Sequence, residues 1–265
     1  MRRTSGRVGV GLVLASLLLA AGGTAAADAR VAAADADQWG SPTSTPATAA
    51  ATARVAVELY RRGAFVSQTN LVQCVGASMQ MMLNIIGPEV DRSAATQRRL
   101  FDLARSLRDP STAGSRTWRG ASARGWALGL TEVGAGPYRV VSAASIGEAL
   151  AMAARAMSAT HRPVGLLVWQ GAHAWVMSGF EATGDPVADP TARVTAVRVL
   201  DPLYPRAGGS WGPTPAPNAR LATALLARVF VPWRPYSRNL ALRGRFVLVL
   251  PYEPPASRST RPQPA

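Results

Sequence analysis

The chain has 265 residues, of which 48% are hydrophobic, which is enough for one good-sized globular domain. Its net charge is +14, and all 29 basic side chains are arginines. These arginines are scattered and accompany no nucleic-acid-binding motif, so we expect no nucleic acid as a partner. The positive charge is compatible with electrostatic contact with an anionic cell envelope or with acidic substrates.

The first 27 residues have the three-part layout of a secretory signal peptide. Arginines precede an apolar run from Val8 to Ala21, and the small residues 25–27 form a cleavage site. The run is shorter than the roughly 20 residues that a membrane span needs, so we expect export with cleavage. An uncleaved N-terminal anchor is the alternative. The expected location is therefore secreted or extracytoplasmic.

Two low-complexity segments flank the expected folded unit. Residues 28–52 are rich in Ala, Thr, Ser and Pro, which predicts a flexible linker or a short pro-segment. Residues 253–265 are rich in proline and poor in apolar side chains, which predicts a disordered tail. The folded domain is therefore expected at residues 53–252.

The first part of this domain predicts mainly helices. Residues 55–65 are ambiguous between helix and strand. The hydrophobic periodicity predicts helices at 75–86, 93–107, 120–130 and 145–158, and a short strand at 138–141. Ser93 is the expected N-cap of the second helix, because serine is a favoured residue at that position.

The second part predicts strands. The β-rich segments are 163–169, 173–182, 194–201 and 243–251, separated by Gly, Asp and Pro turns. A helical or loop insertion is expected at about 203–240. Helices followed by antiparallel strands indicate the α+β class.

Cys74 is the only cysteine, so it cannot form an intramolecular disulfide. Exported proteins usually use cysteines in pairs, which makes a solitary thiol notable. Cys74 lies at the predicted start of a helix, where unpaired backbone amides and the helix dipole favour the nucleophilic thiolate. The alternative interpretation is a buried and inert small hydrophobic residue.

Three further residues can supply the other roles that a cysteine nucleophile needs. His173, one of only two histidines, begins a predicted strand and can act as general base. Asp201 ends the next strand and can orient that imidazole. Gln68 can donate its side-chain amide to an oxyanion. Each also has an ordinary structural interpretation, and no spacing matches a metal or cofactor site.

The order of these residues resembles that of the papain-like cysteine peptidases, most closely their C39-like branch. The segment "QTNLVQCVGASMQMMLNIIG" is similar to the nucleophile segment of that family, and "RPVGLLVWQGAHAWVMSGFEA…VTAVRVLDP" to the segment with its base and acid. The resemblance spans about residues 65–205. It implies a papain-like α+β fold, with the cysteine on an N-terminal helical half and the histidine and aspartate on a C-terminal antiparallel sheet half.

The resemblance implies Cys74 as nucleophile, His173 as general base, Asp201 as orienting carboxylate and Gln68 as oxyanion donor. The implied activity is that of an exported cysteine peptidase, which hydrolyses peptide or isopeptide bonds of a peptide or protein substrate through a thioester. Two alternatives stay open. "CVGAS" in place of "CGPAS" fits a catalytically inactive binding module at the cell surface, and a cysteine acyltransferase shares the thioester step.

Overall fold

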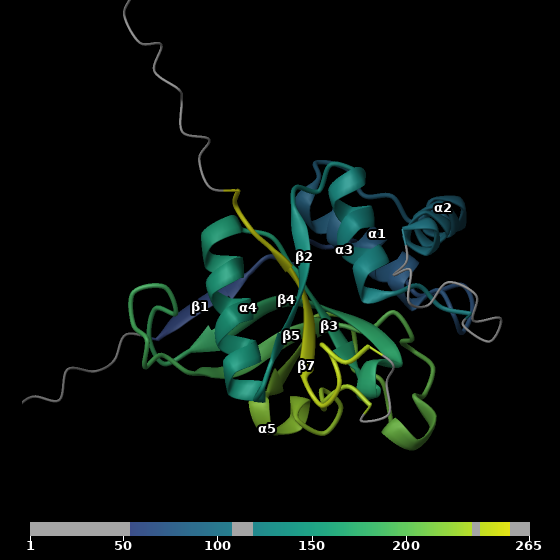
Figure 1. The fold of residues 1–265 in the computed structure, drawn as a ribbon. Helices are drawn as coiled ribbons and strands as arrows, with labels where there is room; N and C mark the ends of the chain where they lie inside the picture. Colours follow the sequence, from purple (N-terminus) through teal and green to yellow (C-terminus); the bar gives the residue numbers. More distant parts are fainter. Residues whose placement is uncertain (1–53, 108–118, 235–238, 255–265) are drawn as a thin grey trace, which may run out of the picture. The chain divides into compact units, whose positions relative to one another are not determined.

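The computed structural model describes residues 54–107, 119–234 and 239–254. The predicted signal peptide, the predicted linker or pro-segment and the chain from residue 255 onward lie outside these described residues. Figure 1 shows the described elements as one ribbon, coloured along the chain. Within the described ranges, no helix has both the length and the apolar character that crossing a membrane would require.

The helices begin where short polar side chains cap them. The helices are α1 (Cys74–Ile86), α2 (Ala94–Ser106), α3 (Ala123–Glu132), α4 (Ile146–Thr160) and the short α5 (Thr223–Leu226). The hydroxyls of Ser93, Ser122 and Ser145 each accept a hydrogen bond from a backbone N–H three residues further on. This satisfies one of the amides that a helix leaves unpaired at its start. The predicted cap at Ser93 is confirmed.

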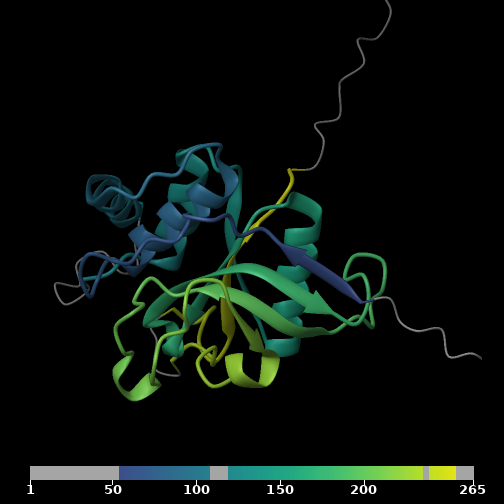
Figure 2. The same ribbon diagram turned by 180° about the vertical axis from the view of Figure 1, so that it is seen from behind.

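The strands form one antiparallel sheet. They are β1 (Val55–Glu58), β2 (Tyr138–Ala143), β3 (Val164–Val168), β4 (His173–Ala182), β5 (Val194–Leu200), β6 (Ala219–Ala222) and β7 (Phe246–Pro251). Their order is β2-β7-β3-β4-β5-β6, and β1 pairs with β4 outside this path. β3 pairs with the first half of β4 and β1 with its second half, so both lie along the same edge of that strand (Figure 2).

Helices cover both faces of the sheet. One hydrophobic cluster joins α1, α2 and α3 to the sheet, and it includes Ala174 and Val176 of β4. A second cluster joins α4 to the sheet and includes Trp175 and Met177 of the same strand. Successive side chains of a strand point to opposite faces, so β4 contributes to both cores. The sequence of β4 is almost continuously apolar because both of its faces are buried.

The predicted α+β class is confirmed, with helices in the N-terminal half and an antiparallel sheet in the C-terminal half. Two local expectations change. The ambiguous segment 55–65 contains only the strand β1, and the expected helical or loop insertion at 203–240 also contains the strand β6. Both strands are short and gain their hydrogen bonds from partners far along the chain, which local periodicity does not register.

Candidate active site

Cys74 is the first residue of α1, and Gln73 is the N-cap. The first backbone amides of a helix have no partner within it, and the N-cap side chain makes no hydrogen bond to those of α1. The hydroxyl of Ser78 donates a 3.3 Å hydrogen bond to the carbonyl of Ala174, the residue after His173. The helix that carries the thiol is thereby attached to the strand that carries the imidazole.

The segment that leads into Cys74 is held by one glutamine of α2. The Gln97 side chain is buried, accepts from the Thr69 N–H at 2.8 Å and donates to the Ser67 carbonyl at 3.1 Å. A single amide therefore satisfies two backbone groups of this loop. It fixes the course of the chain just before the nucleophile.

The same segment is also tied to the loop that follows Asp201. The Gln68 N–H donates to the Pro202 carbonyl at 2.7 Å, and the Ser67 hydroxyl donates to the Tyr204 carbonyl at 2.6 Å. These bonds join residues more than 130 positions apart in sequence. They keep the cysteine segment and the aspartate segment in a fixed relation.

His173 begins β4 directly after a tight turn. Trp169, Gln170 and Gly171 all have left-handed backbone angles, with φ values of 57°, 57° and 83°. Only glycine adopts this region without cost, so the two other residues store backbone strain. A Cβ atom at Gly171 would also lie 2.4 Å from the Trp233 ring. The turn therefore requires glycine at 171 for two separate reasons.

Asp201 directly follows β5 and is fully buried behind His173. Its Oδ1 accepts from the Leu203 N–H at 2.8 Å and lies 2.7 Å from Nε2 of His173. Oδ2 is also buried and has no hydrogen-bond partner among the described residues. The carboxylate thus holds the proton of the imidazole on Nε2 and leaves Nδ1 available on the other side of the ring.

The surroundings favour the protonated form of His173. Burial alone would lower the pKa of this side chain, which is 5% exposed. The hydrogen bond to Asp201, an interaction with the Cys74 side chain and the negative charges of both partners outweigh burial and raise the pKa of His173 to about 9. This raised pKa favours a positively charged imidazole beside the Cys74 side chain at neutral pH.

Two tryptophans cover the histidine. The Trp169 ring stacks on the His173 ring with centroids 4.3 Å apart and an angle of 20° between the planes. Trp211 stacks on Trp169 in turn, at 6.1 Å and 9°. An indole face attracts a cation, so this stack favours imidazolium and fixes the ring orientation. Sequence reasoning did not assign this role, because a tryptophan four residues before a histidine follows no recognisable motif.

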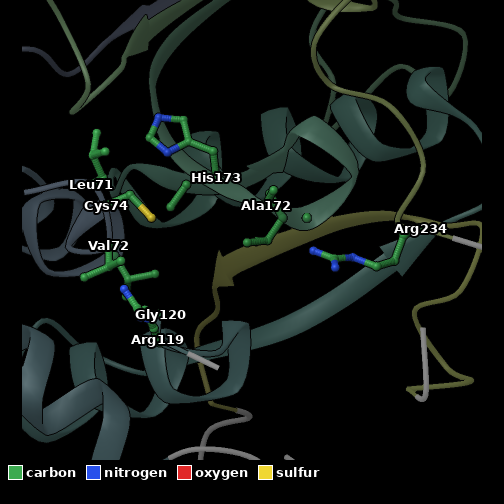
Figure 3. Close-up of a pocket in the computed structure, with 13 residues that line it drawn as sticks. Leu71, Val72, Cys74, Arg119, Gly120, Ala172, His173 and Arg234 are labelled. Carbon is green, nitrogen blue, oxygen red and sulfur yellow. The ribbon is translucent and has the colours of Figure 1, made fainter. Parts of the chain in front are cut away.

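Cys74 and His173 line the same pocket, which has a volume of about 230 Å³ (Figure 3). Leu71 also lines it and is 77% exposed, so an apolar side chain stands open to solvent next to the thiol. Among the described residues that line the pocket, Arg119 and Arg234 are the charged ones besides His173, and none is an Asp or Glu. The pocket is therefore positively charged.

Gln68 lies near the site but does not line the pocket. Its side chain is buried, and its amide donates to the Asn70 carbonyl at 2.7 Å. Its Oε1 is buried without a partner among the described residues. The role of Gln68 as oxyanion donor stays a prediction, whereas Cys74 and Val75, the first two residues of α1, line the pocket.

No group of three or more His, Cys, Asp or Glu side chains in the described part of the chain is arranged to hold a metal ion. The site consists of a half-buried thiol at the head of a helix, an imidazole that begins a strand and a buried carboxylate at the end of the next strand. This is the arrangement that the resemblance to papain-like cysteine peptidases implies.

Comparisons with known proteins give structural matches alone: no family model and no curated protein sequence matches this chain. One similar solved structure is UfSP from C. elegans, at 17% identity and a TM-score of 0.42. The match covers 76% of this chain and 34% of that one, so this chain spans about a third of the nematode protein. Another is a protein from Bacillus anthracis described as a C39-like peptidase, at 12% identity and a TM-score of 0.37, with 74% and 98% covered.

Proposed function

We propose that this protein is a cysteine peptidase that hydrolyses amide bonds of peptides or proteins, including isopeptide bonds. One observation carries the proposal: Cys74 and His173 line one pocket, and the His173 ring is hydrogen-bonded at 2.7 Å to the buried Asp201. A thiolate, a proton donor beside it and an orienting carboxylate are the groups that amide cleavage by a cysteine requires.

The proposed reaction has two halves. The Cys74 thiolate attacks the substrate carbonyl carbon, and the new oxyanion accepts hydrogen bonds from backbone amides at the start of α1. The C–N bond then breaks as the His173 imidazolium gives its proton to the leaving amine, which leaves a thioester. In the second half His173 removes a proton from water, the hydroxide attacks the thioester, and the C–S bond breaks to release a carboxylic acid and the thiolate.

We further propose that the protein acts outside the cytoplasm, where its signal-like first 27 residues would direct it. The net charge of +14 supports electrostatic contact with an anionic cell envelope. Fractionation of expressing cells tests this part of the proposal. Protein that keeps residues 1–27 and stays in the cytoplasm would contradict it.

The activity can be tested cleanly because the chain has one cysteine and two histidines. We expect the wild type to cleave fluorogenic peptides and to react rapidly with a fluorescent iodoacetamide at pH 7. Cys74→Ala should lose both signals, and His173→Gln should lose cleavage and react more slowly. His161→Gln is the matched control, since that histidine is exposed and ends α4 away from the pocket.

One observation favours a non-catalytic binding module as the second candidate. The Gln68 amide donates a hydrogen bond to the Asn70 carbonyl, and Gln68 is not among the residues that line the pocket, so its side chain is not placed there as an oxyanion donor. Such a module would show slow alkylation of Cys74, equal in wild type and His173→Gln, and no cleavage of any peptide.

Acyl transfer by a cysteine acyltransferase is a separate alternative. An added amine acceptor such as glycine ethyl ester identifies it, because an amide product then replaces the acid.

A further inference from the structure

We propose that Arg234, together with Arg119, makes this pocket a site for a substrate carboxylate, either an acidic side chain or the C-terminal group of a peptide. The inference rests on the proposed peptidase function for its cleavage readout, but the binding it describes can be measured without catalysis. It names the chemistry that would select a substrate, which the cysteine, histidine and aspartate leave open.

Arg234 is held in place by its backbone and extends its side chain into the pocket. The guanidinium of Arg234 points from the loop before β7 toward the space beside Ala172 (Figure 3). The Arg234 N–H donates to the Gln170 carbonyl at 3.3 Å. The preceding residue, Trp233, exchanges backbone hydrogen bonds with Gly244 and Arg245, at 2.9 Å and 2.7 Å. The charge is thus positioned by the turn that also carries His173.

Neither pocket arginine has an internal partner in the described ranges. The ion pairs there use Arg162, Arg198 and Arg220, which contact Glu253, Glu58 and Glu181. Arg119 and Arg234 form no salt bridge or side-chain hydrogen bond among the described residues, although Arg234 is only partly exposed. An unpaired guanidinium beside a reactive centre is available for a ligand anion.

The two arginines approach the pocket from different elements. Arg119 belongs to the segment before α3 and is exposed, whereas Arg234 belongs to the loop before β7. A guanidinium can bind both oxygens of a carboxylate through two parallel hydrogen bonds. Since none of the described lining residues is acidic, no side chain among them competes with a substrate carboxylate.

Binding is tested with full-length Cys74→Ala, which cannot turn its ligand over. The probes are N-acetylated alanine hexapeptides with one glutamate at each position in turn, and the same set with glutamine, and their binding is measured by isothermal titration calorimetry. Each peptide is made with a free C-terminus and with a C-terminal amide. We expect at least one glutamate peptide, or the free-acid form of the series, to bind about tenfold more tightly than its neutral counterpart. Tighter binding of a glutamate peptide indicates that the site takes a side-chain carboxylate. Tighter binding of the free-acid form indicates that it takes a C-terminal carboxylate.

The variant Arg234→Gln, made in the Cys74→Ala background, should remove this preference and leave the affinity for the neutral peptides unchanged. Arg98→Gln is the matched control, because Arg98 is an exposed arginine of α2 outside the pocket. Raising the salt concentration should weaken the preferred peptide more than the neutral one. Equal affinity for acidic and neutral peptides, or a preference that survives in Arg234→Gln, would overturn the carboxylate site.

The same peptides given to the otherwise wild-type enzyme separate this inference from the proposed function. Cleavage of neutral peptides by Arg234→Gln, with the acidic preference lost, supports both. Cleavage without any acidic preference refutes the carboxylate site alone. Selective binding without cleavage or thiol reactivity refutes the peptidase and keeps the carboxylate site.

Discussion

The two sides of the pocket are held in place by different physical means. The thiol side, residues 66–73 and the start of α1, is fixed by hydrogen bonds from polar side chains such as Gln97 and Ser67. The imidazole side is fixed by the register of β4 and by the left-handed turn, whose Trp169 stacks on His173 and whose Gly171 packs against Trp233. The first depends on individual polar contacts and the second on sheet pairing and aromatic packing.

This difference predicts two kinds of failure. Loss of a polar contact on the thiol side should loosen the loop and alter the reactivity of Cys74 while the sheet stays intact. A steric change on the imidazole side should instead lower the stability of the whole domain, because β4 lies in the middle of the sheet and contributes to both cores. The following variants test the comparison, beginning with the largest expected effect.

Asp201→Asn should lower kcat/KM by about 10²- to 10⁴-fold, because the imidazole loses the carboxylate that orients it. It should also move the alkaline limit of activity. In the wild type, activity falls on the acid side as the thiolate–imidazolium pair gains a proton, and on the alkaline side as His173 loses its own near pH 9. Without the negative charge of Asp201 the pKa of His173 falls, so the alkaline limb moves to lower pH.

The kcat/KM–pH profile measures both effects. Asp189→Asn is the control, since Asp189 accepts hydrogen bonds from Thr191 in a loop outside the pocket. An alkaline limb at the same pH in Asp201→Asn and wild type would show that Asp201 does not set the protonation of His173.

Gly171→Ala should destabilise the domain by about 2–4 kcal/mol, since the new methyl group meets the Trp233 ring and the backbone is left-handed. Gly134→Ala separates the two causes, because Gly134 has a similar φ of 81° but no atom within 4 Å of the added Cβ. Urea denaturation should show about 1 kcal/mol for Gly134→Ala. Equal losses in the two variants would mean that the contact with Trp233 contributes nothing.

Gln97→Ala should cost about 1–3 kcal/mol, because it leaves the Thr69 N–H and the Ser67 carbonyl without their partner. It should also change the rate at which Cys74 is alkylated. Gln80→Ala is the matched control: Gln80 is buried in α1 and its amide also bonds two loop carbonyls, those of Asp91 and Ser93. Similar stability losses with a changed alkylation rate only in Gln97→Ala would support the division between the two sides.

Trp169→Leu should give the smallest effect, a loss in kcat/KM of about two- to tenfold, because one stacked ring contact disappears. The alkaline limb should move slightly to lower pH, since the indole face no longer stabilises imidazolium. Trp211→Leu keeps Trp169 on the histidine and should leave the pH profile in place. A loss of rate with an unmoved pH limb would assign Trp169 a purely steric role.

The features of this site that depend on local sequence could be predicted from the sequence alone. The strand at 173–182 and the start of the helix near Cys74 follow from periodicity and turn residues, and the structure has them within one residue. The pairing of Asp201 with His173 follows from strand ends in adjoining strands. These features depend on neighbours in sequence or on one simple strand pairing.

The missed features all depend on distant parts of the chain. The stacking of Trp169 on His173 depends on the left-handed turn, and no sequence motif predicts that turn. The pairing of β6 with β5 joins four weakly β-forming residues to partners 20 to 26 positions earlier in the chain. In the sequence, nothing distinguishes Arg234 from the other scattered arginines. Its position at the pocket depends on the loop before β7 lying beside Gln170. Tertiary contacts of this kind carry no local periodic signal.

The pairing of β1 with the far end of β4 determines where the chain enters the domain. Val55 lies opposite Ala182, nine residues along the strand from His173, which corresponds to roughly 30 Å at the rise of a β-strand. A tether, purification tag or carrier protein joined ahead of Val55 therefore starts at the opposite end of that strand from the imidazole. Immobilisation through the N-terminal side should therefore leave the thiol accessible. The labelling experiments described above can then be carried out on surface-bound protein.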